Sequence, residues 1–205
     1  MIPYNESLEI PLMESFYSVQ GEGFHTGRPA FFIRFSGCNV GCSWCDVKES
    51  WDATIHPLVQ IDSILQEVLD SGTNFVVITG GEPTMYNLAP LTAALKKNNI
   101  EIAIETSGAY PINGQIDWIC LSPKKFKMPL EENYAKANEL KMIAVNNHDF
   151  KWALELDQKV SPQCKRFIQP EWDKQDGILP KVIDFVKENI HWKISLQTHK
   201  ILNVR

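Results

Sequence analysis

Short apolar runs that alternate with amphipathic stretches are the feature that most restricts the fold of this chain. Seven runs of five to seven residues predict strands, because they are nearly continuous in apolar residues and are bounded by polar residues, glycine or proline. Helical spacing of apolar residues, with a glycine stop or an asparagine start, predicts helices over 61–72 and 87–99. The predicted strands are AFFIRF (30–35), FVVIT (75–79), IEIAIET (100–106), DWICLS (117–122), LKMIAV (140–145), RFIQP (166–170) and WKISL (192–196).

This alternation predicts an α/β fold with a parallel sheet, since parallel strands need helical connections that cover the sheet. The spacing alone leaves open whether the sheet is doubly wound or part of a TIM-like barrel. Either arrangement places ligands at the carboxyl ends of the strands. At 205 residues the chain has the length of about one domain, so we expect a single domain over residues 1–205.

Charge and composition exclude several classes of protein. The net charge of -5 argues against a surface that coats nucleic acid. No apolar run reaches the roughly 18 residues of a bilayer span, and the opening stretch MIPYNESLEIPL carries acids where a signal peptide carries bases. We therefore expect a cytoplasmic protein with no membrane and no nucleic acid partner. In a reducing compartment, a cluster among its five cysteines is expected to hold metal or do chemistry.

Polar and glycine-containing motifs follow most of the predicted strands directly. Each motif alone is ordinary loop sequence. Because the carboxyl ends of parallel strands meet at one edge of a sheet, their shared position predicts one site. The motifs are the cysteine loop after Phe35, GGEP (80–83), TSG (106–108), SPK (122–124), QP (169–170) and QTHK (197–200).

The spacing C-x3-C-x2-C of Cys38, Cys42 and Cys45 suits a loop wrapped around several metal atoms. Iron-sulfur clusters are held by one thiolate per iron, so three thiolates leave one iron of a 4Fe-4S cluster open for a ligand. The alternative is a tetrahedral zinc site with a distant fourth ligand, which would be Cys120, Cys164 or a histidine. Both cysteines stand in apolar surroundings, where buried inert thiols are usual.

The cysteine loop after a first strand, with GGEP after the second, resembles the radical S-adenosylmethionine superfamily. Within it, the chain is similar to the 7-carboxy-7-deazaguanine synthase family from about Glu14 to Arg205. The segments that carry this resemblance are FYSVQGEGFHTGRPAFFIRFSGCNVGCSWCD (16–46), TGGEPT (79–84), ETSG (105–108), LSPK (121–124), QP (169–170) and QTHK (197–200). The resemblance implies a pared-down, partial TIM-like barrel of parallel strands.

The resemblance also implies the chemistry. A 4Fe-4S cluster chelates S-adenosylmethionine, one electron from a flavodoxin-type donor reduces the cluster, and the resulting 5'-deoxyadenosyl radical takes hydrogen from a pterin. The substrate, 6-carboxy-5,6,7,8-tetrahydropterin, becomes 7-carboxy-7-deazaguanine with loss of ammonia, on the route to 7-deazapurines such as queuosine. S-adenosylmethionine is regenerated, and the enzyme is expected to be a homodimer.

Site residues follow from the resemblance, position by position. For S-adenosylmethionine and the cluster it implies Trp44 and Asp46 beside the cysteines, Gly80, Gly81, Glu82 and Pro83 at the methionine group, and Ser107, Ser122, Pro123 and Lys124 at the ribose and adenine. Glu82 is expected to meet the methionine ammonium. For the substrate it implies Gln20, Gly21 and Glu22 along the pterin edge, Arg34 as a bidentate clamp on the carboxylate, and Val19, Thr79, Glu105, Gln169, His199 and Arg205 in the rest of the pocket.

One position departs from the family pattern. Val47 stands where the family commonly has a threonine whose hydroxyl helps to hold Mg2+ against the substrate carboxylate. Mg2+ demands oxygen ligands, so water, Glu49 or Ser50 would have to replace that hydroxyl, or Lys48 would supply positive charge in place of the ion. We expect a weakened or missing dependence on Mg2+.

Two other functions stay open on sequence grounds. A glycyl-radical activating enzyme shares the cysteine spacing, although QGEG before the cysteines favours a small substrate. A non-catalytic iron-sulfur or metal module would be marked by a fourth nearby cysteine, which this sequence lacks. The segment KKFKMPLEEN (124–133) is expected to be a solvated loop whose lysines could steer an acidic electron donor. His25, His56, His148 and His191 are assigned no role.

Overall fold

A nine-stranded sheet forms the centre of the computed structural model, which describes residues 8–205. Most of the opening stretch from which we expect no signal peptide therefore lies outside the described residues. The sheet order is β3-β1-β2-β4-β5-β6-β7-β8-β9. The strands are β1 (Glu9–Val19), β2 (Pro29–Phe35), β3 (Leu58–Gln60), β4 (Phe75–Gly80), β5 (Glu101–Thr106), β6 (Trp118–Leu121), β7 (Glu139–Ala144), β8 (Lys165–Pro170) and β9 (Trp192–Ile194).

All seven predicted strands are present, with ends that differ from the prediction by no more than two residues. They pair in parallel from β2 to β9. The prediction missed β1 and β3. β1 pairs antiparallel with β3 on one side and with β2 on the other. β1 contains a proline and mixes acids with apolar residues, and its register shifts between Leu12 and Glu14, so its sequence has no simple strand pattern.

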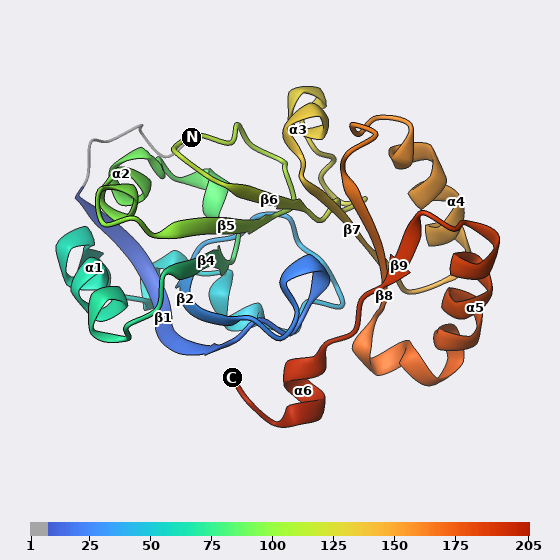
Figure 1. Cartoon of the computed structure of the whole chain (residues 1–205), viewed down its shortest axis with the longest axis horizontal. Coiled ribbons are helices and arrows are strands. Elements are labelled where there is room, and N and C mark those ends of the chain that lie inside the picture. Colours follow the sequence, from blue (N-terminus) through green and yellow to red (C-terminus); the bar gives the residue numbers. More distant parts are fainter. Residues whose placement is uncertain (1–7) are drawn as a thin grey trace.

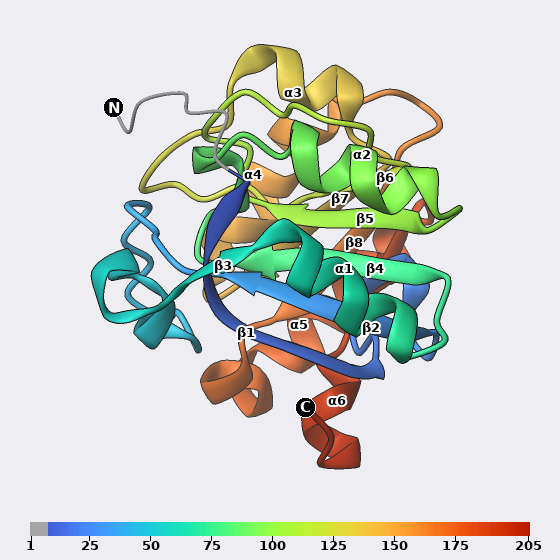
Figure 2. The same cartoon turned by 90° about the vertical axis from the view of Figure 1, so that its left-hand side faces the viewer.

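Helices connect the parallel strands and cover one face of the sheet, in chain order from α1 to α5 around the outside of the molecule (Figure 1). The view in Figure 2 shows α1 and α2 packed against β4 and β5. The two predicted helices are present, slightly shorter than expected. The helices are α1 (Ile61–Asp70), α2 (Ala89–Lys97), α3 (Glu131–Lys136), α4 (Asn147–Asp157), α5 (Gln175–Glu188) and α6 (Thr198–Leu202). No helix among residues 8–205 is long and apolar enough to cross a bilayer.

The two faces of the sheet differ because successive strand residues point to opposite sides. On β2, Ile33 and Phe35 join the main core beneath α1 and α2, whereas Phe32 belongs to a smaller apolar group on the other face. A second core under α4 and α5 contains Leu140 and Met142 of β7. Lys141, the residue between them on β7, points to the inner face and lines a cavity there, so this face carries charge as well as apolar side chains.

The sheet does not close into a full barrel, since β3 and β9 are its edges. Backbone and side-chain contacts instead join the segment after β9 to the loop after β1. Thr198 donates from both its backbone N and its Oγ1 to the carbonyl of Gly21, each at 2.9 Å. Ser195 Oγ accepts from the backbone N of Gly23 at 2.9 Å. This junction places the loop QGEG (20–23), which we call the pterin loop, beside β7 and the carboxyl end of β8.

Candidate active site

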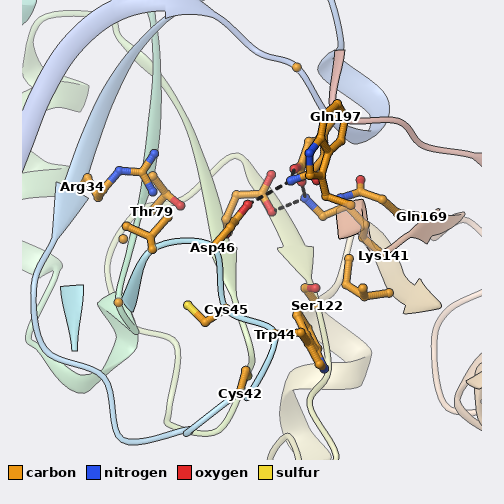
Figure 3. Close-up of a pocket in the computed structure, with 18 of the residues that line it drawn as sticks. Arg34, Cys42, Trp44, Cys45, Asp46, Thr79, Ser122, Lys141, Gln169 and Gln197 are labelled. Atoms are coloured by element: carbon orange, nitrogen blue, oxygen red, sulfur yellow. Dashed lines mark hydrogen bonds and ion pairs between the residues drawn. The ribbon is translucent and has the colours of Figure 1, made fainter. Parts of the chain in front are cut away.

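A cavity of about 610 Å³ lies on the inner face of the sheet, toward the carboxyl ends of the parallel strands. Its volume is typical of small-molecule sites. Every residue that the sequence analysis assigned to the cluster, to S-adenosylmethionine or to the pterin lines this cavity, except Pro83 and Pro123. Figure 3 shows Arg34 and Thr79 on one side of it, and Lys141 and Gln169 on the other. We call the loops that follow β2, β4, β5 and β6 the rim, and the group Gln20, Glu22, Glu105, Lys141 and Gln169 the floor.

The cysteine loop brings Cys38, Cys42 and Cys45 to the rim of the cavity. Burial raises the pKa of Cys42 to about 11, and it also raises the pKa of Cys38. The thiols of Cys38 and Cys42 therefore hold their protons until a metal displaces them. Cys120 and Cys164, the candidate fourth ligands for zinc, are buried and do not line the cavity. Within residues 8–205, no three His, Cys, Asp or Glu side chains gather closely enough to hold a single ion.

Backbone contacts join the cysteine loop to GGEP. Gly81 donates its N–H to the carbonyl of Phe35, and Glu82 donates its N–H to the carbonyl of Gly37, each at 2.9 Å. A Cβ on Gly81 would lie 2.3 Å from the oxygen of Gly37 and 3.1 Å from the Cβ of Cys38. Only glycine allows this approach, so the second glycine of GGEP fixes Cys38 against the end of β4.

The Glu82 carboxylate is turned into the protein, where its residue is 1% exposed. Its Oε1 accepts from Thr84 N at 3.1 Å, Thr84 Oγ1 at 2.6 Å and Thr106 Oγ1 at 2.5 Å. Its Oε2 accepts from Ser107 N at 2.8 Å and from the Ser107 hydroxyl. Five protein donors use most of the acceptor capacity of one carboxylate. This geometry makes Glu82 the brace that ties the ends of β4 and β5 together.

Lys124 is the charged residue of the SPK turn. The sequence analysis expected segment 124–133 to be a solvated loop, but Lys124 is half-buried. Its Nζ donates to the Ser122 carbonyl at 2.5 Å and to the Ser122 hydroxyl at 2.8 Å. The same atom lies 5.6 Å from the centre of the Trp44 ring. Burial lowers the pKa of Lys124. The turn thus presents an ammonium, a hydroxyl and an aromatic ring to the cavity together.

Lys141 is the central residue of the floor, and the sequence analysis missed it. Its Nζ lies 2.5 Å from Glu22 Oε2 and 2.7 Å from Glu105 Oε2. Gln20 Nε2 donates to the other oxygen of Glu105 at 3.3 Å, and Gln197 Nε2 donates to the other oxygen of Glu22 at 2.9 Å. The signal was present in LKMIAV, since a lysine in a buried strand needs a partner.

The charges of the floor support one another. Burial would raise the pKa of Glu22, but the charge and hydrogen bond of Lys141, with help from Gln197, lower it to about 2. Burial would likewise lower the pKa of Lys141, yet Glu105 and Glu22 raise it well above its usual value. Glu22 and Lys141 are therefore both ionised at neutral pH.

Glu139 lies beneath the floor, two residues before Lys141 on the same face of β7. Its Oε2 accepts from Phe24 N at 3.2 Å and Trp118 Nε1 at 3.0 Å, whereas its Oε1 has no partner in the described part of the chain. Burial and then the charge of Glu105 raise the pKa of Glu139 to about 7. A Cβ on Gly23, which has φ +65°, would lie 2.0 Å from this Oε1. Glycine lets the pterin loop pack onto Glu139.

Arg34 lies on the inner face of β2 and lines the cavity. Its Nε donates to Glu14 Oε1 at 2.8 Å, which fixes the side chain from the β1 side. Arg205 also bonds to the Glu14 carboxylate, and its carbonyl accepts from Ser18 Oγ at 2.6 Å. Figure 3 shows Thr79 directly beside Arg34. The arginine is therefore held by one carboxylate while it faces the cavity.

Asp46 and Val47 follow the last cysteine on the same rim. Asp46 Oδ2 accepts from Lys200 Nζ at 2.9 Å and from Gln197 Nε2 at 3.1 Å. Lys200 Nζ also lies 4.9 Å from the centre of the Trp172 ring. Neither Glu49 nor Ser50 lines the cavity, and the Ser50 hydroxyl donates to the Val47 carbonyl at 2.7 Å. These two side chains do not bring an oxygen to the place of the missing threonine.

Comparison with known proteins accounts for this arrangement. The model of the Radical SAM superfamily matches residues 32–156. The chain is 50% identical over 195 residues to a 7-carboxy-7-deazaguanine synthase from Flavobacterium psychrophilum, which covers 95% of this chain and 92% of that protein. It is 44% identical over 207 residues to the same enzyme from Synechocystis sp., with 100% and 99% covered.

Comparison of the fold with solved structures identifies the same family. A crystal structure of QueE from Escherichia coli superposes with a TM-score of 0.82 at 30% sequence identity, covering 94% of this chain and 96% of that chain. The sheet is thus the partial barrel of radical SAM enzymes, and not the doubly wound sheet that the strand spacing also allowed. The matches are to synthases, and not to a glycyl-radical activating enzyme or a non-catalytic metal module, the two other functions that the sequence left open. The chain belongs to the 7-carboxy-7-deazaguanine synthase family of the radical SAM superfamily.

Proposed function

We propose that this chain is the radical SAM lyase that converts 6-carboxy-5,6,7,8-tetrahydropterin to 7-carboxy-7-deazaguanine with loss of ammonia, in queuosine and 7-deazapurine biosynthesis. The observation that carries the proposal is the pairing of two chemistries in one cavity. Three cysteines line the cavity at its rim, and the carboxylates and amides of the floor line the same cavity. A pterin has a ring edge of N–H donors beside a carbonyl, and such a floor suits it.

The residues present fit a 4Fe-4S cluster and S-adenosylmethionine. Cys38, Cys42 and Cys45 would hold three irons, and the described cavity offers no cysteine for the fourth. Bound together, and with one electron from the donor, the two groups would supply radical abstraction of a hydrogen atom from the pterin. Gly80, Gly81, Ser107 and the Ser122–Lys124 turn would bind the rest of S-adenosylmethionine. Glu82 would act on it indirectly, by holding Ser107 and the end of β4 in place.

The floor and Arg34 would orient the substrate. The carboxylates of Glu22 and Glu105 accept hydrogen bonds from the amino and ring N–H groups of the pterin, while Gln20 and Gln169 offer both donors and acceptors. Arg34, fixed by Glu14, binds the substrate carboxylate. His199 packs against the loop at Gly21, where a Cβ would lie 2.2 Å from its Nδ1. The pterin ring is thereby held at the inner face of the sheet, with its carboxylate toward β2.

Mg2+ would have little support at this site. Val47 offers no side-chain oxygen, and Asp46, the nearest carboxylate in sequence, is already paired with Lys200. A hard cation needs several oxygen ligands in near-octahedral geometry. We expect turnover with a chelator to stay within about threefold of turnover with added Mg2+, and Val47→Thr to restore a dependence. A rise of tenfold or more on adding Mg2+ to the unmodified enzyme would count against this expectation.

The electron donor would be an acidic, flavodoxin-type protein that docks beside the cysteine loop. Segment 122–128 contains three lysines and no acid, although the whole chain carries a net charge of -5. Lys127 Nζ donates to Asn39 in the cysteine loop at 3.0 Å and to Tyr110 OH at 2.5 Å, and Phe126 beside it is exposed. Lys127→Glu should slow reduction by a flavodoxin about tenfold at low salt and leave reduction by dithionite unchanged. Lys136→Glu, on α3, is the control.

The remaining expectations concern the state of the protein. A single domain over residues 1–205 is supported by one continuous sheet across the described part. A homodimer is supported by exposed apolar side chains on α6 and on the edge strand β9, namely Ile201, Leu202 and Ile194. We also propose that the enzyme works in the cytoplasm, where its cysteines stay reduced. Light scattering of the reconstituted enzyme tests the dimer, since it reports molar mass directly.

Anaerobic reconstitution followed by turnover tests the main proposal. We expect about four irons and four sulfides per chain. With dithionite and S-adenosylmethionine, the carboxytetrahydropterin should give 7-carboxy-7-deazaguanine without stoichiometric consumption of S-adenosylmethionine. Arg34→Ala should keep the cluster and lose most turnover. A protein that binds one zinc, shows no cluster absorbance and releases no deazaguanine would overturn the proposal.

A further inference from the structure

Lys141 reaches two carboxylates that come from separate parts of the fold. Glu105 lies on β5, two strands away from β7 in the sheet, and Glu22 lies in the loop after β1. The lysine is 3% exposed and contacts each carboxylate through one oxygen, at 2.5 Å for Glu22 and 2.7 Å for Glu105. It therefore acts as a bridge across the inner face of the sheet, at the bottom of the cavity.

Two carboxylates in one buried site do not both ionise unless a cation compensates them. The groups that face Lys141 are mostly acidic. Besides Glu22 and Glu105 they are Glu139 on its own strand and the Cys120 thiol on β6. The cationic or basic groups nearby are Lys124 after β6 and His199 on α6, which lie farther from the two carboxylates than the bonded ammonium. Without Lys141, the pair has no bonded cation, so one proton would be shared between its members.

The second oxygen of each carboxylate shows how the bridge would serve a ligand. Glu22 Oε1 accepts from Gln197, and Glu105 Oε1 accepts from Gln20. The amides fix the rotation of both carboxylates, and each carboxylate oxygen keeps a free lone pair. Glu22, Glu105 and Lys141 all line the cavity. Two oriented carboxylates form an acceptor surface for a ring edge that carries several N–H donors.

We infer that Lys141 is the positioning residue that holds the Glu22 and Glu105 carboxylates together as a paired acceptor, and that this pair selects pterins with a 2-amino group over rings with a 2-oxo group. The inference rests on the proposed function and adds to it a residue and a specificity. A 2-oxo ring would place a carbonyl oxygen against a carboxylate. Such a site rejects the wrong ring strongly, because its buried groups are left unpaired.

Equilibrium binding tests the inference without turnover. The probes are the product 7-carboxy-7-deazaguanine and its 2-oxo analogue 7-carboxy-7-deazaxanthine, titrated by calorimetry into reconstituted enzyme with S-adenosylmethionine. The unmodified enzyme should bind the product at least about a hundredfold more tightly than the analogue. Equal affinity for the two compounds would overturn the specificity, and this arm needs no variant to fold.

The variants Lys141→Met and Lys141→Arg test the bridge. Lys141→Met should bind the product about tenfold or more weakly, and the loss should grow between about pH 8 and about pH 6, as the carboxylate pair takes up a proton. Lys141→Arg should recover most of the affinity and the flat pH response of the unmodified enzyme. Lys136→Met, which removes an exposed lysine on α3, is the matched control.

Three readouts separate the possible failures. Iron content and S-adenosylmethionine binding should be unchanged in Lys141→Met, which distinguishes a local effect from misfolding. Product binding by Lys141→Met that equals the unmodified enzyme and stays flat with pH would overturn the role of Lys141. Unmodified enzyme that binds its cluster but neither binds the product nor forms it would instead overturn the proposed function.

Discussion

At the rim of the cavity, Cys38, Cys42 and Cys45 share one short loop, whereas at its floor Lys141 bonds to residues 36 and 119 positions away in the chain. The rim is fixed largely by backbone hydrogen bonds, such as those from Gly81 and Glu82 to the loop after β2. The floor is fixed by charged side chains. A rim of this kind tolerates many side-chain changes outside its motifs, but the floor depends on the charge of each member.

The largest effect should come from removing a thiolate at the rim. Cys42→Ala leaves two ligands for the cluster, so we expect loss of cluster absorbance and a fall in turnover of at least roughly a thousandfold. The floor has its own contacts and should survive. Product binding by the apo variant, compared with that of the unmodified apo enzyme, checks this. Loss of product binding in the variant alone would show that rim and floor are not independent.

A change beneath the floor should alter stability with pH. The pKa of Glu139 rises from about 4.5 in the unfolded chain to about 7 in the folded one, so the folded state holds a proton that the unfolded state releases. The free energy of unfolding therefore falls as pH rises through this window, by about 3 kcal/mol for this buried group.

Glu139→Gln cannot lose a proton and should remove this part of the pH dependence. Chemical denaturation at about pH 5 and about pH 8 measures the free energy of unfolding of both proteins. From the lower to the higher pH, the difference between the variant and the unmodified protein should shift by about 3 kcal/mol in favour of the variant. The exposed Glu132→Gln is the control. Parallel pH curves for Glu139→Gln and the unmodified protein would show that Glu139 is ionised in the fold.

Glu82 extends the comparison, because it is a buried carboxyl side chain within a rim that is otherwise fixed largely by backbone hydrogen bonds. Glu82→Gln exchanges one acceptor oxygen for a donor, opposite the hydroxyls and N–H groups of Thr84, Thr106 and Ser107. We expect the free energy of unfolding to fall by about 2 kcal/mol. Denaturation of the apo protein measures this effect. Full stability combined with weak S-adenosylmethionine binding would instead support direct contact between Glu82 and the methionine ammonium.

The smallest effect should come from Ser195, which joins the segment after β9 to the pterin loop and to Gln169 of the floor. Its Oγ accepts from Gly23 N and donates to Gln169 Oε1 at 2.6 Å. Ser195→Ala should cost about 1 kcal/mol of stability and raise KM more than it lowers kcat, because Gln169 loses its orientation. Ser161→Ala, at an exposed turn, should change neither quantity. An unchanged KM in Ser195→Ala would separate this contact from substrate binding.

The sequence could predict the parallel strands and the rim because both are local. An apolar run such as FVVIT reports a buried strand by itself, and the motifs follow the strands directly. β1 was missed because a strand of mixed polarity that contains a proline has no period of its own. β3 was missed because it is only three residues long and pairs with β1, which lies far from it in the chain. Position within the cavity could be predicted for Glu22 and Glu105, but not their link through Lys141. Such a link depends on which strands become neighbours, and strand patterns do not specify that.

The junction between the loop after β1 and the segment after β9 has a consequence for synthesis. Gly21 and Thr198 are 177 residues apart in the chain, and their contact helps to hold the pterin loop. At a typical rate of about 5 to 20 residues per second, the ribosome makes the second partner roughly 10 to 35 seconds after the first. During that interval the pterin loop has no Ser195 or Thr198 to bind. We expect nascent chains stalled before Ser195 to expose this loop to proteases, and longer chains to protect it once Thr198 has left the exit tunnel.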